Sequence, residues 1–236
     1  MEQKTGFEPY LAPTPILDSD HPAVVAFARR STVGVAAGED STRQAAVAIY
    51  YAVRDGIWYD PYYPFYRPEH YQASRVLASG RGYCVSKAAL LCAMSRTLGI
   101  PCRLGFATVR NHLATRQLID FLGSDLFVYH GYVEFYLDHR WVRATPAFNR
   151  ELCERHRVEP LEFDGVNDSI FHPYNRENQR FMEYVAYHGT WADVPVKRIV
   201  SEWETAYGKE RVRGWIAAFE AAEGNAIRDF YREDVI

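Results

Sequence analysis

Residues 82–103 read GYCVSKAALLCAMSRTLGIPCR, and this stretch decides the fold. From Cys84 onward, apolar residues recur at spacings of three and four, which predicts a buried helix that begins at the cysteine. Gly99 ends this helix, and Pro101 supports the stop because proline cannot continue it. Residues 102–109 then read as a strand. The stretch therefore places a cysteine at the N-terminus of a core helix that is followed directly by a strand.

A second stretch, HGYVEFYLDHRWVRATP at residues 130–146, reads as an antiparallel hairpin. Its first strand covers residues 130–137 and alternates between the two faces of a sheet. Asp138-His139-Arg140 forms the turn, and the second strand ends at Pro146. The hairpin brings His130 to the start of a strand.

The elements on either side are mainly helical. Asp20 is expected to cap a helix over residues 22–30, and a second helix is expected over residues 41–56. Beyond the hairpin the pattern becomes irregular, and the last third returns to helix. Helices, then strands, then helices predict an α+β fold. We expect a single domain over residues 1–236, with a core at about 41–150, an N-terminal helix and a mainly helical C-terminal extension.

Residues 57–71 read IWYDPYYPFYRPEHY, a segment rich in proline and aromatic rings. Its three prolines argue against a regular element. The segment lies shortly before Cys84, so it could form one wall of a groove. Equally, it could be a loop that its own rings pack down.

Composition excludes several classes of protein. The formal net charge is −3 and the aromatic share is 15%. Lysine and arginine are scattered rather than gathered in a basic stripe, so no nucleic-acid partner is expected. No signal peptide or membrane-spanning stretch is recognised, so we expect a cytoplasmic protein with reduced thiols and no membrane association. No CxxC pair occurs, and neither a metal nor a cofactor is expected.

Cys84 and His130 have the chemistry of a nucleophile and its base. A helix N-terminus favours the thiolate, because its free N–H groups and dipole stabilise negative charge. The glycines Gly80 and Gly82 let the backbone approach a substrate, and the N–H of Cys84 is a natural donor to an oxyanion. A histidine accepts the thiol proton and returns it to the leaving group. A third group should orient the imidazole.

Together these motifs resemble the transglutaminase-like superfamily over about residues 47–149. The family pattern is Gly-x-Cys opening a helix, then Arg-x-Leu-Gly-Ile-Pro-x-Arg, then His-x-Trp-x-Glu, a short turn and Trp-Val. The residues that match are Arg96, Gly99, Ile100, Pro101, Arg103, His130, Glu134, Trp141 and Val142. The resemblance implies a papain-like core, with the cysteine helix on an antiparallel sheet. It also implies Cys84 and His130 as a catalytic pair for acyl transfer from an amide.

The sequence departs from the family at the third catalytic position. The family has an aspartate before proline, whereas this chain has Thr145. A threonine hydroxyl can accept a hydrogen bond from imidazole, but it brings no charge to stabilise an imidazolium. Thr145 is the first candidate, and it is equally a plain strand residue. Asn149, Asp164 and Asp168 are further candidates, and a dyad without a third side chain also fits.

Other residues near the motifs receive structural interpretations. Tyr132 replaces the tryptophan of the family pattern, and Glu134 should share a strand face with His130 and pair with an arginine such as Arg103. Cys92 and Cys102 are expected in the core, and Cys153 is left open. The remaining histidines considered are expected at the surface or in loops: His112, His139, His156, His172 and His188.

The leading hypothesis is a cysteine hydrolase or acyltransferase that attacks an amide or isopeptide carbonyl through a thioester. Its partner would be a peptide, a protein or a small amide. One alternative is an inactive binding module of the same fold, which the missing aspartate favours. Another is an N-acyltransferase, although no phosphate-binding loop for a cofactor such as coenzyme A is seen. The sequence leaves open the substrate, the acceptor and the oligomeric state.

Overall fold

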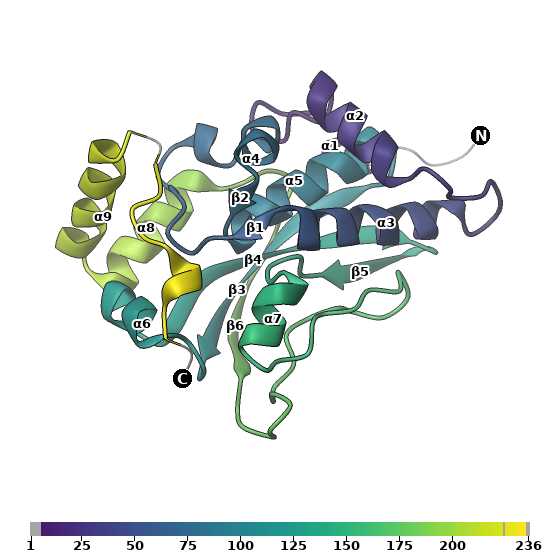
Figure 1. Ribbon diagram of the computed structural model, residues 1–236. Coiled ribbons are helices and arrows are strands. Elements are labelled where there is room, and N and C mark those ends of the chain that lie inside the picture. The colour runs from purple at the N-terminus through teal and green to yellow at the C-terminus, as the bar shows by residue number, and fades with distance from the viewer. Residues whose placement is uncertain (1–5, 224, 235–236) are drawn as a thin grey trace.

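A four-stranded antiparallel sheet lies at the centre of the computed structural model, which describes residues 6–223 and 225–234 (Figure 1). The strand order is β5-β4-β3-β6. The strands are β3 (Cys102–Asn111), β4 (Leu126–Leu137), β5 (Arg140–Ala144) and β6 (Met182–Trp191). The mixture of helices with an antiparallel sheet confirms the predicted α+β class.

Strands β4 and β5 form the predicted hairpin, with Val133 opposite Ala144. The turn residues Asp138 and His139 both have positive φ, at 47° and 64°. Two consecutive residues of this kind are typical of the tight turn whose twist matches a right-twisted hairpin. The hairpin therefore holds a fixed register that determines which side chains share a face with His130.

Helix α5 (Cys84–Thr97) packs between the sheet and a layer of helices, as Figure 1 shows. Every residue from Cys84 to Arg96 is buried, as expected of a helix that is covered on all sides. The sequence correctly predicted this helix and its start. The covering helices are α2 (Pro22–Ser31), α3 (Ser41–Gly56) and α4 (Ala73–Ser79).

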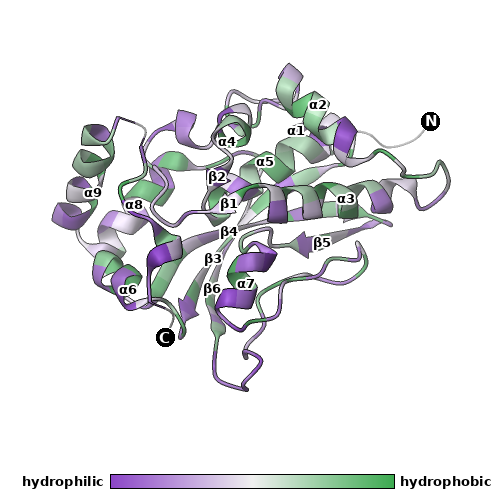
Figure 2. Cartoon of the chain, in the orientation of Figure 1, coloured by the Kyte–Doolittle hydropathy of each residue, from purple (hydrophilic) through white to green (hydrophobic). Residues whose placement is uncertain are grey.

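The remaining elements surround this core. In Figure 2, α3, α7 and α9 carry bands of hydrophobic and hydrophilic colour, as amphipathic helices do. Within residues 6–223 and 225–234, no helix has both the length and the apolar character needed to cross a bilayer. These elements are α1 (Glu8–Leu11), β1 (Trp58–Tyr59), η1 (Pro68–His70), β2 (Arg81–Gly82), α6 (Arg116–Leu122), α7 (Arg150–Arg155), α8 (Val196–Tyr207), α9 (Lys209–Ala221) and η2 (Phe230–Arg232).

The structure corrects four sequence predictions. Strand β4 begins at Leu126, so His130 lies within the strand rather than at its start. The N-cap of α2 is His21, whose Nδ1 accepts from the N–H of Ala23, rather than Asp20. The segment 57–71 contains the short strand β1 and the 3-10 turn η1, and most of its rings are buried. The C-terminal third is not only helical, because β6 adds a strand to the central sheet.

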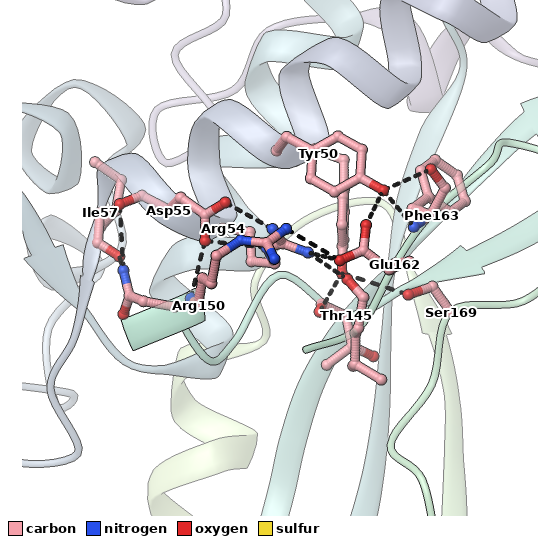
Figure 3. A network of polar contacts seen from close by, with 12 residues as sticks. Tyr50, Arg54, Asp55, Ile57, Thr145, Arg150, Glu162, Phe163 and Ser169 are labelled. Carbon is pink, nitrogen blue, oxygen red and sulfur yellow. Dashed lines mark hydrogen bonds and ion pairs between the residues drawn. The ribbon is translucent and has the colours of Figure 1, made fainter. Parts of the chain in front are cut away.

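A polar network connects α3 to the chain that follows β5 (Figure 3). The hydroxyl of Tyr50 donates to the carbonyl of Leu161 at 2.8 Å and lies 3.2 Å from the carbonyl of Thr145. The guanidinium of Arg54, which is 1% exposed, donates to the same Leu161 carbonyl and pairs with Asp55 and Glu162. The network therefore fixes the backbone at Thr145, where the sequence placed a candidate catalytic residue.

Replacing Tyr50 with phenylalanine should lower the free energy of unfolding by about 1–3 kcal/mol, because the buried hydroxyl and its hydrogen bond to the Leu161 carbonyl are lost. Chemical denaturation measures this loss. The exposed Tyr187, replaced in the same way, provides a control that should change stability by less than about 0.5 kcal/mol. Equal effects of the two substitutions would show that the network contributes nothing specific.

Candidate active site

Cys84 is the first residue of α5 and is 8% exposed. The preceding residue, Tyr83, has extended backbone, and no side chain caps the helix start. The first N–H groups of a helix have no partner within the helix. The thiol therefore lies beside donors that the fold leaves free for it.

The environment of the Cys84 sulfur has two opposing effects. Burial raises the pKa of the thiol to about 11. The backbone N–H groups of Gly131, Val85 and Cys84 lie near the sulfur and act in the other direction. Burial is the larger effect, so the resting group is a neutral thiol with backbone N–H groups close to it.

His130 follows an irregularity in β4. The pairing of β3 with β4 shifts between Ala107 and Val109, and Tyr129 has a φ of 60°. Such bulges redirect side chains and recur next to active sites. The next residue, Gly131, faces the helix start: a Cβ there would lie 2.8 Å from Val85 Cα. The bulge and the glycine together bring the histidine segment against the cysteine.

The imidazole of His130 has an apolar environment. Its ring centroid lies 4.8 Å from that of Phe171 and 6.4 Å from that of Tyr184. Within the described ranges, Nε2 is buried without a hydrogen-bond partner. Burial lowers the pKa of His130 to about 3. The imidazole is therefore neutral near pH 7 and able to accept a proton.

Cys84 and His130 both line two adjoining hollows. One hollow extends toward α7 and the C-terminal segment and is bounded by Phe148 and Phe230. The other extends toward α8 and is bounded by Trp203. Tyr59, from the aromatic segment before the cysteine, lines both. The arrangement offers a nucleophile and a base to a substrate with apolar surfaces on both sides.

No hydrogen bond between the side chains of Thr145 and His130 is seen among the described residues. Thr145 follows β5, and its buried Oγ1 makes no well-aligned hydrogen bond within the described residues, although the Tyr184 hydroxyl lies beside it. The side chain of Asn149 hydrogen-bonds to another segment instead of to His130, because its Oδ1 accepts from the N–H of Tyr59 at 2.7 Å. The third catalytic residue therefore stays a prediction.

The two acidic candidates also have other partners. Asp164 accepts hydrogen bonds from the N–H groups of Val166 and Asn167 in its own loop. Asp168 accepts from the N–H of Arg143. Neither carboxylate is recorded in contact with His130, so the structure adds no support for either as the orienting group.

Other sequence interpretations are confirmed or corrected. Glu134 pairs with Arg103, with 2.6 Å between Oε2 and Nη2, as predicted. Cys92 and Cys102 are buried, as predicted, and so is Cys153. His188 was interpreted wrongly, because it belongs to strand β6, whereas His156 lies in the turn after α7 as expected.

His156 is partly buried against the hollow bounded by Phe148 and Phe230, and its ring stacks on that of Phe230. His188 belongs to β6, where it stacks on Tyr129 and hydrogen-bonds to Thr108. In the part of the chain that the structure describes, no three side chains of His, Cys, Asp or Glu are grouped to hold a metal ion.

Sequence reasoning missed the residues that surround His130. Phe171 and Tyr184 come from the segment beyond the hairpin, which showed no strand pattern. Phe230 comes from the C-terminal segment. The density of aromatic residues along the chain was the available signal, but it did not say which rings meet.

The neutral buried state of His130 predicts a loss of stability in acid. Its pKa is about 3 in the fold against 6.5 ordinarily, so between these values the unfolded chain binds a proton that the folded chain does not. Stability is therefore fully present above about pH 6.5 and falls as the pH drops. His130→Phe should reduce the slope of unfolding free energy between pH 4.5 and 6 by about 1.4 kcal/mol per pH unit. Denaturation at several pH values measures it.

His112→Phe, at a surface position, is the matched control and should leave that slope nearly unchanged. His70 and His156, whose pKa values burial lowers to about 4, add to the acid sensitivity that both variants keep. An unchanged slope in His130→Phe would mean that His130 is not buried in its neutral form.

Two of three comparisons with known proteins found similar proteins. Residues 29–146 match the model of a family described as the transglutaminase-like superfamily. A solved structure, named "Putative Cysteine Protease from Cytophaga hutchinsonii", aligns at a TM-score of 0.45 and 14% identity. The alignment covers 80% of this chain and 55% of that one, so this chain spans little more than half of that protein's length. The comparison with curated proteins found no match.

Proposed function

Because the chain belongs to the transglutaminase-like superfamily, we propose that it is a cysteine enzyme in which Cys84 attacks an amide or isopeptide carbonyl and His130 transfers the proton. The substrate would be a peptide, a protein or a small amide. Release of the acyl group to water makes the enzyme a protease or deamidase. Release to an amine makes it a transglutaminase.

The proposed reaction has two halves. In the first, His130 takes the thiol proton as the sulfur bonds to the carbonyl carbon, and the N–H of Cys84 donates to the developing oxyanion. The C–N bond then breaks, and His130 gives the proton to the departing amine. In the second half, water or an amine attacks the thioester carbonyl while His130 takes a proton from it, the C–S bond breaks, and His130 gives that proton to the departing sulfur.

One observation carries this proposal: Cys84 begins α5 and lines the same two hollows as His130. The neutral imidazole and the neutral thiol are the protonation states with which general-base attack begins.

Cys84 should react with iodoacetamide at least about tenfold faster than the other cysteines near neutral pH, because it alone combines a hollow with a base. The other thiols are more deeply buried than Cys84: Cys92, Cys102 and Cys153. The rate should rise with pH, because the pKa of the thiol is about 11 and thiolate increases toward it. Peptide mapping by mass spectrometry after timed quenching measures each site.

Labelling in denaturant is the control, and there all four thiols should react at similar rates. If the four also react equally in the folded protein, the assignment of Cys84 as a nucleophile fails.

The second candidate function is an inactive binding module. It is favoured by the apolar environment of His130, where no carboxylate among the described residues stabilises an imidazolium. This alternative predicts that no acyl donor forms a covalent intermediate. A thioester on Cys84 would eliminate it.

A further inference from the structure

The hollow beside Cys84 that Phe230 bounds has walls that are mostly apolar. They come from segments far apart in the sequence: β3, α6, α7, the chain before β6 and the C-terminal segment. Representative wall residues are Val109, Leu118, Leu152, Phe171, Phe181 and Phe230. We propose that this hollow binds an apolar acyl group, aliphatic or aromatic, while that group is attached to Cys84. The inference rests on the proposed thiol chemistry and names its substrate class.

Two polar residues that line this hollow, Asn111 and Thr115, are already engaged, and burial lowers the pKa of His156 to about 4, so its ring carries no charge near pH 7. The Oδ1 of Asn111 accepts from the N–H of Leu113 at 3.0 Å. The Oγ1 of Thr115 accepts from the N–H of Leu118 and donates to Glu233. Burial of a charge or a polar group without a partner is costly. The hollow therefore disfavours a charged or amide-bearing acyl group and favours a hydrocarbon one.

The C-terminal segment closes one side of this hollow. The Glu233 carboxylate accepts from the hydroxyls of Tyr62 and Thr115, each at 2.5 Å. Arg155 also donates to the backbone carbonyl of Glu233 at 2.6 Å. These contacts hold Phe230 against the hollow as part of its wall. The wall is thus anchored by buried polar contacts that lie outside the space itself.

The two hollows differ in enclosure, which distinguishes their roles. The hollow bounded by Phe230 is the more enclosed, and the one bounded by Trp203 and Tyr207 is the more open. The acyl group stays on the enzyme through the thioester stage, whereas the amine leaves and an acceptor enters. The enclosed hollow therefore suits the acyl group, and the open one suits the groups that exchange.

The test uses p-nitrophenyl esters of straight-chain acids from acetate to octanoate. The sulfur of Cys84 bonds to the acyl carbon, the ester C–O bond breaks, and p-nitrophenolate leaves while the thiol proton goes to His130. The acylation rate is the rate constant of the initial burst of p-nitrophenolate. For each ester it is divided by the rate constant of hydrolysis by hydroxide, which corrects for the ester's intrinsic reactivity. Each buried methylene should add up to about fourfold. We expect hexanoate to exceed acetate at least tenfold, and a flat series would overturn the proposal.

Variants locate the preference. Leu152→Ala, which removes three carbons from the wall, should move the best chain length up by about that number of carbons. Leu98→Ala is the matched control, because Leu98 lies at the other end of α5. It should keep the preference of the parent protein. An unchanged preference in Leu152→Ala, or the same change in both variants, would overturn the assignment to this hollow.

A binding measurement separates this inference from the proposed catalysis. In Cys84→Ala, which has no thiol at this position, calorimetry should show hexanamide binding at least tenfold tighter than acetamide. If no ester acylates Cys84 yet hexanamide shows this preference, the thiol chemistry fails and the apolar hollow stands. If Cys84 is acylated but neither series prefers the longer chain, the substrate class is wrong and the catalysis stands.

Discussion

Replacing His130 with alanine is expected to slow the acylation of Cys84 by p-nitrophenyl acetate about 100- to 10,000-fold near pH 7. The thiol has a pKa of about 11, so little thiolate exists at neutral pH and attack depends on a base. Burial holds the pKa of His130 at about 3, so its imidazole is unprotonated near pH 7, which is the form that a general base must have. Stopped-flow measurement of the p-nitrophenolate burst gives the rate.

The matched control is His112→Ala, because His112 lies at the surface, where its Nε2 is 3.3 Å from a carboxylate oxygen of Glu183. It should acylate at the parental rate. If His130→Ala keeps a rate within about twofold of the parent while remaining folded, His130 is not the base.

Replacing Gly131 with alanine is expected to cost about 1–3 kcal/mol of unfolding free energy and to slow acylation of Cys84 as well. The new Cβ would lie 2.8 Å from Val85 Cα and 2.9 Å from Val85 Cγ2. Backbone cannot move aside as the end of a flexible side chain can. The strand and the start of α5 must therefore separate, which also displaces the Gly131 N–H from the sulfur. Denaturant titration and the ester burst measure the two effects.

Gly214→Ala is the control for this substitution. Gly214 lies inside α9, and a Cβ there would meet no atom within 4 Å. Alanine favours helix over glycine, so this variant should gain about 0.5–1 kcal/mol and keep its activity. A Gly131→Ala protein as stable and as active as the parent would contradict the close packing of strand against helix start.

The elements that carry Cys84 and His130 were predictable because each has a strong local pattern. The apolar spacing after Cys84 and the stop at Gly99 determine the helix, and the alternation after His130 determines the strand. The pairing of Glu134 with Arg103 followed from the same alternation. Local periodicity and turn chemistry were sufficient for these features.

The surroundings of His130 were not predictable, because they depend on strand β6. Its residues are mostly exposed and show no regular alternation. The strand forms by pairing with β3, and its register shifts twice along that pairing. Tyr184 reaches His130 through this long-range pairing, whereas Phe171 follows a segment in which Ser169 bridges to Ala144 of β5. Neither contact is encoded by a local pattern, so the group beside His130 could not be derived from the hairpin alone.

The central claim is that Cys84 forms a thioester with an acyl donor, and one measurement tests it directly. The folded protein is mixed with p-nitrophenyl acetate, quenched in acid within the burst, digested and mapped by mass spectrometry, with Cys84→Ala in parallel. The account predicts an acetyl group on Cys84 that hydroxylamine removes, and no such burst in Cys84→Ala. A parent protein that is folded but carries no acetyl group on Cys84, or a Cys84→Ala variant with the same burst, would contradict it.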